Sequence, residues 1–219
     1  MKGFMKKSAL KKLLVVAVLT TGLVNLQGCF PIIAAGVATG TLAAADRRTT
    51  GTQLEDKTIE IKAGSRIGDR FRDGIHVNVN SYNRRVLLTG EVFNEAMKAD
   101  VEKIVAGIES VAGVVNELEV QGTASFTART SDSLITGKVK ASFVDAKEVF
   151  VNAFKVTTER GIVYLQGRVT QAEGERAADV ASRVSGVAKV IKVLDYITED
   201  ELKQLKTLSA PSEGGATKK

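Results

Sequence analysis

The chain has 219 residues, enough for one domain of ordinary size or two small ones. Its 44% hydrophobic and 26% charged residues are typical of a globular protein and exclude wholesale disorder. The formal charge of +6 indicates no nucleic-acid partner, because five of the 31 basic residues are lysines that precede Cys29, where no acidic residue occurs. From Cys29 onward the chain carries 26 basic and 25 acidic residues, a net charge of +1.

Residues 1–28 predict a lipoprotein signal peptide. Residues 1–12 are basic, residues 13–24 form an apolar run, and residues 26–29 (LQGC) have the pattern of a lipobox. The run is too short for a transmembrane helix, which needs about 20 apolar residues. Because the thiol of a lipobox cysteine accepts diacylglycerol, we expect cleavage before Cys29 and lipid attachment to it. Phe30 follows where Asp would be a retention signal, which favours delivery to the outer membrane.

Residues 29–53 are expected to form a lipidated tether. Its apolar part, residues 30–45, could lie as a short helix on the bilayer, and Gly36 and Gly40 have a G-x-x-x-G spacing. Pro31 and five β-branched residues favour a mobile tether instead. Since the chain has a single cysteine, it can form no internal disulfide and no cysteine-based zinc site.

An internal repeat organises the rest of the chain. Residues 86–92 (VLLTGEV) recur as residues 163–169 (VYLQGRV), at an offset of 77. Residues 111–115 match residues 187–191 at an offset of 76, so one residue has been gained or lost between them. The repeat predicts two homologous modules, a polar linker and a C-terminal tail, at residues 54–120 and 131–198, 121–130 and 199–219.

The first module predicts the order helix, strand, strand, helix, strand. Ile59, Ala63 and Ile67 recur every four residues, as on a helix that buries one face. His76 to Asn80 then alternates with a period of two, as a half-buried strand does. The later elements are expected as a turn, a return strand, a helix and a last strand, at residues 82–85, 86–92, 95–107 and 114–120.

The second module repeats this order, with a turn at 159–161 and a helix over 171–185. Helices on one face of a small sheet define a two-layer α+β sandwich, αββαβ in each module. A core built from roughly 70 residues is small and marginal alone. Gly90 and Gly167 lie inside strands, which suggests bulges or close packing against a helix. After the module, the capping-box pattern at 198–201 predicts a short helix, followed by a disordered tail.

These motifs resemble a known family. Residues 161–169 (GIVYLQGRV), with an Ala-rich helix and residues 184–190 (VSGVAKV) after them, resemble the BON domain. The chain is similar to the dual-BON outer-membrane lipoproteins of Gram-negative bacteria, the DolP/YraP family. This similarity includes residues 46–52 (DRRTTGT), the tandem arrangement of two modules and the lipobox. The resemblance implies a periplasmic, lipid-anchored outer-membrane protein whose second module binds anionic phospholipid. It also implies a role in envelope integrity and a link to the division site.

The chain departs from the family pattern at three places. Asn83-Arg84 stand in the first module where the motif glycine is expected, and Leu134 replaces the family's tryptophan at the start of the second module's first helix. The tail also extends beyond the usual end of the family's sequences.

The sequence indicates no catalytic residue, no metal site and no cofactor. A catalytic Ser or Cys needs a neighbouring base, and the one histidine, His76, is expected to face solvent on its strand. Asp69, Asp73 and Glu91 lie near one module's strands and are interpreted as ordinary surface charge. Scattered carboxylates alone do not make a transition-metal site. We therefore predict that the protein is not an enzyme.

The candidate lipid-binding residues lie on the second module's first helix. At 100° per residue its core stripe is Ile135, Val139 and Phe143. A second face is apolar or small and is flanked by lysines; it consists of Leu134, Gly137, Lys138, Lys140, Ala141 and Val144. Such a face suits an anionic bilayer. Alternatively it packs against the first module or the linker, or it binds a protein partner in the outer membrane or at the division site.

The matching helix of the first module is expected to carry a solvated, mixed-charge surface. Its charged residues away from the core stripe are Lys57, Glu60, Lys62, Arg66, Asp69 and Arg70.

Overall fold

The computed structural model describes residues 46–72, 75–122 and 126–209. The predicted signal peptide, Cys29 and nearly all of the apolar tether lie outside these ranges, as do Asp73 and the end of the tail. Among the residues that the structure describes, no helix combines the length and apolar character needed to cross a membrane.

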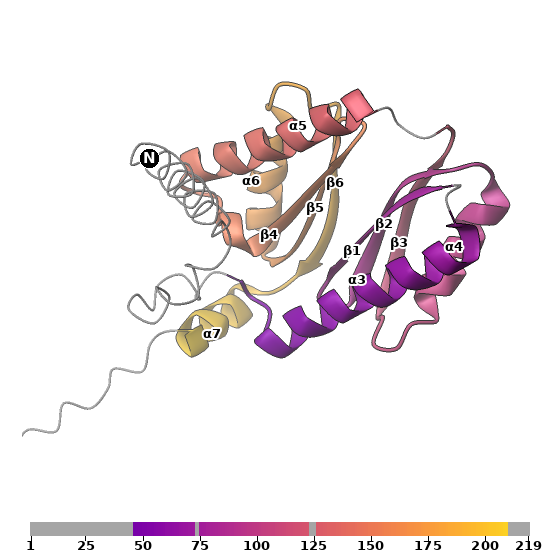
Figure 1. Cartoon of the computed structure of the whole chain (residues 1–219). Coiled ribbons are helices and arrows are strands. Elements are labelled where there is room, and N and C mark those ends of the chain that lie inside the picture. Colours follow the sequence, from indigo (N-terminus) through magenta and orange to yellow (C-terminus); the bar gives the residue numbers. More distant parts are fainter. Residues whose placement is uncertain (1–45, 73–74, 123–125, 210–219) are drawn as a thin grey trace, which may run out of the picture. The chain divides into compact units, whose positions relative to one another are not determined.

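The first module has the predicted order αββαβ (Figure 1). Its elements are α3 (Thr50–Phe71), β1 (His76–Tyr82), β2 (Arg85–Val92), α4 (Glu95–Ala106) and β3 (Gly113–Val120). β2 pairs antiparallel with β1 and parallel with β3. Thr49 caps α3 and Asn94 caps α4 by accepting backbone N–H bonds, which satisfies donors that a helix start leaves free.

The second module repeats this topology in a separate sheet. Its elements are α5 (Phe126–Asp145), the short 3₁₀ helix η4 (Val151–Ala153), β4 (Phe154–Glu159), β5 (Ile162–Val169), α6 (Gln171–Ser182) and β6 (Lys189–Tyr196). Two sheets of three strands, each covered by two helices, confirm the predicted α+β fold.

Two helix boundaries differ from the predicted ones. α5 begins at Phe126, inside the segment expected to be a linker. No glycine or proline lies between Gly122 and Leu134, so no residue of this stretch interrupts a helix. α6 ends at Ser182 rather than at residue 185.

The short C-terminal helix is confirmed as α7 (Glu199–Ser209). Thr198 and Glu201 bond reciprocally at its start: Glu201 N–H donates to Thr198 Oγ1, and Thr198 N–H donates to Glu201 Oε2. Leu202 on this helix is buried, so α7 packs onto the body.

Each module has its own hydrophobic core at matching repeat positions. Leu88 and Leu165, like Val92 and Val169, stand at equivalent positions of the repeat and are all buried, so the repeat marks equivalent core sites. The predicted stripe of α3 is also buried, as is that of α5. Each stripe packs with residues of the second helix and the sheet of its own module.

Both β-hairpin turns have two residues in the left-handed region. The φ angles are 51° and 63° at Asn83 and Arg84, and 49° and 74° at Arg160 and Gly161. A buried aspartate from the preceding helix holds each turn. Asp56 accepts backbone N–H bonds from Asn83 and Arg84 at 2.8 and 2.7 Å. The first module therefore keeps the turn without the motif glycine.

In the second module, Asp132 plays the part of Asp56. It accepts the backbone N–H bonds of Arg160 and Gly161, each at 2.8 Å. The two aspartates are 76 residues apart, the offset of the repeat in this region.

The two strand glycines lie close to backbone at the start of the paired strand, at His76 in β1 and at Ala153 just before β4. A Cβ atom on Gly90 would collide with the carbonyl oxygen of His76, and one on Gly167 would collide with that of Ala153. The expected close approach is therefore real, but its partner is the backbone at the start of the paired strand.

The sheet faces that point away from the helices contact each other. Leu87 of the first module packs with Tyr164 and Val193 of the second in a third apolar cluster. Polar bonds also join the modules, among them Asn78 Nδ2 to Glu159 Oε2 at 2.8 Å and Lys155 Nζ to Glu60 Oε1 at 2.5 Å.

This contact corrects two predictions. His76 does not face open solvent, because its Nδ1 lies 3.0 Å from Glu91 Oε2 and its side chain is 21% exposed. Glu91 is not surface charge, since only 1% of its side chain is exposed. The period-two pattern identified the face away from the helices but could not show that the second module covers it.

Candidate lipid-binding face and the junctions around it

All six predicted lipid-binding residues lie on α5 and are exposed. Leu134 is 63% exposed and Val144 65%. Gly137, Lys138, Lys140 and Ala141 share this outward face. The helix therefore buries one apolar stripe and presents a second one, with lysines beside it.

A groove of about 550 Å³ runs between α5 and α6 beside this face. Lys138 and Ala141 border it from α5, and Val180, Arg183 and Val184 border it from the α6 side. The Arg183 guanidinium is paired with the exposed Asp179 carboxylate. The groove combines apolar walls with two cationic side chains and the carboxylate of Asp145.

Sequence reasoning missed an aromatic residue at the end of α5. Phe150 is 51% exposed and lines a hollow of about 260 Å³ together with Val144 and Lys147. The guanidinium carbon of Arg47 lies 5.8 Å from the Phe150 ring centroid. The available signal was an aromatic residue just after a lysine-containing loop, next to the predicted apolar face.

The outward face of α3 is less uniformly charged than predicted. Leu54 and Ile61 are 69% and 63% exposed on it, which the charge pattern alone did not reveal. Of the six charged residues expected there, five are exposed, and Glu60 is partly buried through its ion pair with Lys155. Thr58 occupies the position of α3 that corresponds to Leu134, since both directly precede the core isoleucine of their helix.

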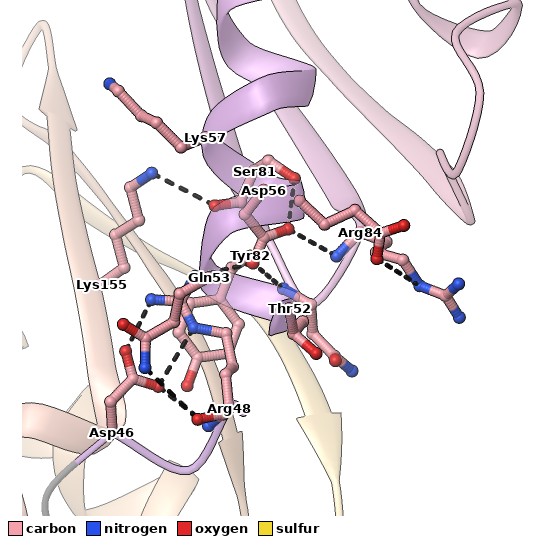
Figure 2. Close-up of polar contacts among 12 residues, drawn as sticks. Asp46, Arg48, Thr52, Gln53, Asp56, Lys57, Ser81, Tyr82, Arg84 and Lys155 are labelled. Atoms are coloured by element: carbon pink, nitrogen blue, oxygen red, sulfur yellow. Dashed lines mark hydrogen bonds and ion pairs between the residues drawn. The ribbon is translucent and has the colours of Figure 1, made fainter. Parts of the chain in front are cut away.

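The segment before α3 binds the first module through Arg48 (Figure 2). Arg48 donates to the carboxylates of Asp46 and Asp56, and its guanidinium carbon lies 4.1 Å from the centroid of the Tyr82 ring. Asp56 also accepts a hydrogen bond from Ser81 Oγ at 2.6 Å. Burial, with the nearby Asp46 charge, raises the pKa of Tyr82 to about 12, so this phenol remains neutral.

The same segment binds the second module through Arg47. Its guanidinium donates to both carboxylate oxygens of Glu173 at 2.7 Å and to the Arg168 carbonyl at 3.0 Å. Glu173 also caps the start of α6 by accepting from Thr170 N–H. The two arginines of the DRRT motif thus attach the incoming chain to both modules.

One group of metal-ligating side chains lies close together among the residues that the structure describes. Nitrogen and oxygen atoms of His76, Glu91 and Glu159 lie within 4.8 Å of one another. They meet where the two sheets face each other.

Comparison with known proteins agrees with this architecture. The BON domain model matches residues 55–122 and 131–198. The outer membrane lipoprotein DolP of Haemophilus influenzae is 42% identical over 88% of this chain and 100% of that protein. The 21 kDa hemolysin of Actinobacillus pleuropneumoniae is 32% identical over 69% of this chain and 79% of that protein.

The osmotically inducible protein Y of Escherichia coli is 28% identical over 63% of this chain and 72% of that protein. These three relatives are thus named as a lipoprotein, a hemolysin and an osmotically inducible protein. With two matched domains and a 42% identical relative, the chain belongs to the family of dual-BON proteins that includes DolP.

Proposed function

We propose that this chain is a lipoprotein of the outer membrane, facing the periplasm, whose second module binds anionic phospholipid through α5. Its relative DolP bears the name outer membrane lipoprotein, and the lipobox at Cys29 supplies the corresponding lipid attachment in this sequence. In this role the protein supports the integrity of the envelope and acts in part at the division site.

The exposed apolar face of α5 is the observation that carries the proposal. Full burial of a leucine contributes about 1.5–3 kcal/mol, and each lysine near an anionic surface adds about 1 kcal/mol. Leu134 is mostly accessible, and Lys138 and Lys140 flank it. The sum gives a weak and reversible contact that salt weakens, because the lysine contribution is screened over about 10 Å at 0.1 M salt.

Vesicle flotation tests the proposal with a matched pair of variants. The body from Asp46 onward contains both hydrophobic cores and lacks the acylated cysteine. It should float with phosphatidylglycerol vesicles. Leu134→Glu should abolish flotation, whereas Ile61→Glu on α3, a residue of the same 63% exposure, should leave it intact. Equal flotation of wild type and Leu134→Glu, or loss in the Ile61 variant alone, would contradict the proposal.

Two further measurements extend this test. Leu134→Trp should strengthen binding, because tryptophan is the better interfacial anchor. Mass spectrometry of the mature N-terminal peptide should find diacylglycerol on Cys29, and Cys29→Ala should block processing there. An N-terminal peptide that starts elsewhere, or carries an unmodified cysteine, would remove the anchor from the proposal.

A protein-adapter function is the second candidate, and α3 favours it. Leu54 borders a groove of about 540 Å³ together with Lys62 and Glu109, so the first module also presents apolar surface beside charge. An adapter would bind an envelope protein and would not float with pure lipid. The flotation result therefore separates the two functions.

A further inference from the structure

The contact between the two sheets brings three metal-binding side chains together from both modules. His76 lies at the start of β1 and Glu91 near the end of β2, where the two residues are paired across the ladder. Glu159 ends β4 of the other module. Their nearest ligand atoms lie within 4.8 Å of one another, and Glu91 and Glu159 are both buried.

Negative charge is in excess around this group. Arg160 Nε lies 3.0 Å from Glu91 Oε1 and 3.6 Å from Glu119 Oε2, so one guanidinium serves two carboxylates. The Glu159 carboxylate accepts its hydrogen bond from the neutral amide of Asn78.

Two buried polar side chains lie on the strands beside this group, Tyr164 on β5 and Thr89 on β2. Burial and the charges of Glu117, Glu119 and Glu159 raise the pKa of Tyr164. Thr89 Oγ1, on the strand position next to Glu91 along the same face, is buried and has no hydrogen-bond partner among the described residues. Around these three side chains the described residues thus hold several carboxylates and an unsatisfied hydroxyl, together with the His76 imidazole and the Arg160 guanidinium.

We propose that His76, Glu91 and Glu159 bind one zinc ion that joins the two modules. One imidazole nitrogen and two carboxylate oxygens at about 2.0–2.2 Å are common zinc ligands, with water in the fourth position. Bonds of this length place tetrahedral ligands about 3.4 Å apart, so ligand atoms that lie within 4.8 Å of one another need to close by at most about 1.4 Å. Imidazole favours zinc over magnesium or calcium, which prefer oxygen ligands throughout.

Binding exchanges one set of contacts for another. His76 gives up its contact with Glu91 and coordinates as the neutral imidazole, so any proton it carried is released to solvent. Glu91 keeps its bond to Arg160 through Oε1 and coordinates through Oε2. The ion replaces an electrostatically unfavourable approach of two buried carboxylates by a bond from each module to the same cation.

Zinc titration of the full chain, purified in detergent and stripped with EDTA, tests this site. Wild type should take up one zinc per chain from a competing fluorescent indicator, and zinc but not magnesium should raise its melting temperature. His76→Ala and Glu159→Gln should each weaken zinc binding by more than roughly 100-fold, because the loss of an outer partner alone already costs 10–100-fold. Glu60→Gln, which removes another carboxylate between the modules, should keep wild-type affinity.

The variant Glu159→Gln distinguishes a loss of zinc binding from a loss of folding. Glutamine has nearly the size of glutamate and its side-chain oxygen can still accept the bond from Asn78 Nδ2, so in EDTA the variant should melt no lower than wild type. A cobalt titration of wild type should give the visible absorption of a tetrahedral site, absent in the variant. A wild type without zinc uptake would overturn the proposal and leave an ion-pair network only. Equal zinc affinity of wild type and Glu159→Gln would overturn it as well.

Discussion

The two modules share a core and differ on their outward helices. Ile59, Ala63 and Ile67 of α3 correspond to Ile135, Val139 and Phe143 of α5, and all six side chains are buried. The outward positions have diverged: Thr58 and Gly68 of α3 correspond to Leu134 and Val144 of α5. Packing restrains the inner positions, whereas the outer ones are free to change, so a duplicated domain can acquire a second role without losing its fold.

The largest effect should come from the core, where the modules ought to respond alike. Phe143→Ala should destabilise by about 3–5 kcal/mol and its counterpart Ile67→Ala by about 2–5 kcal/mol, because each leaves a cavity in a small core. Urea denaturation of the body from Asp46 onward measures both. A loss below about 1 kcal/mol in either variant would show that the two stripes are not equivalent.

Substitution of the two aspartates that hold the turns should destabilise the modules by different amounts. Asp56→Asn should cost about 3 kcal/mol, because Asp56 holds the turn, Ser81 and the Arg48 guanidinium together. Asp132→Asn should cost about 1.5 kcal/mol, the value for hydrogen bonds to a charged group. The control Asp69→Asn, at an exposed carboxylate, should change the urea midpoint little. Equal losses for the two buried aspartates would mean that Arg48 contributes nothing.

The two modules could be predicted from the sequence because their core residues recur at equivalent positions of the repeat. Apolar positions at a fixed offset identified Leu88 and Leu165, and helical spacing identified both faces of α5. Asp56 and Asp132 also repeat, at an offset of 76, but nothing in the position of a polar residue reveals that the backbone of a turn far along the chain donates to it.

Contacts between the modules could not be predicted either. Strand alternation gives the side on which Glu91 lies, and only the packing of the second sheet makes that side an interior. His76 and Glu159 are 83 residues apart, at positions that are not equivalent in the repeat. Phe150 was missed for a similar reason, since it lies in a loop outside any periodic pattern.

The two hairpin turns offer a smaller contrast. Gly161→Ala should destabilise by about 1–2 kcal/mol, because alanine at a φ of 74° is strained and its Cβ would lie 3.1 Å from the Gly186 carbonyl oxygen. Arg84→Gly relieves similar strain but gives the unfolded chain more freedom, so its net effect should stay within about 0.5 kcal/mol. Urea midpoints measure both effects, and a large loss for Arg84→Gly would show that the exposed ion pair of Arg84 with Glu55 stabilises the turn.

The smallest effect should be the pH dependence of the contact between modules. The pKa of Glu60 is lowered from 4.5 despite burial, because Lys155 bonds to it, so its contribution is present above 4.5 and is lost as pH falls through the folded-state value. The pKa of Glu159 is raised, so stability should increase as pH falls from neutral through its folded-state value. The melting temperature, measured in EDTA between pH 4 and 8, should depend less on pH than in wild type for both variants. The change should lie at the higher pH values for Glu159→Gln and at the acidic end for Glu60→Gln. Unchanged curves in both would contradict this assignment.

Arg47 fixes the point at which the tether joins the body. Its bonds to Glu173 and to the Arg168 carbonyl attach the chain to the module that carries α5. With Cys29 acylated as expected, the 17 residue steps from Cys29 to Asp46 can span at most about 60 Å. Within that radius the effective concentration of the α5 face at the bilayer is on the order of millimolar. A face with millimolar affinity would then be bound for about half of the time, so that modest changes in lipid charge or salt could switch the body between bound and released states.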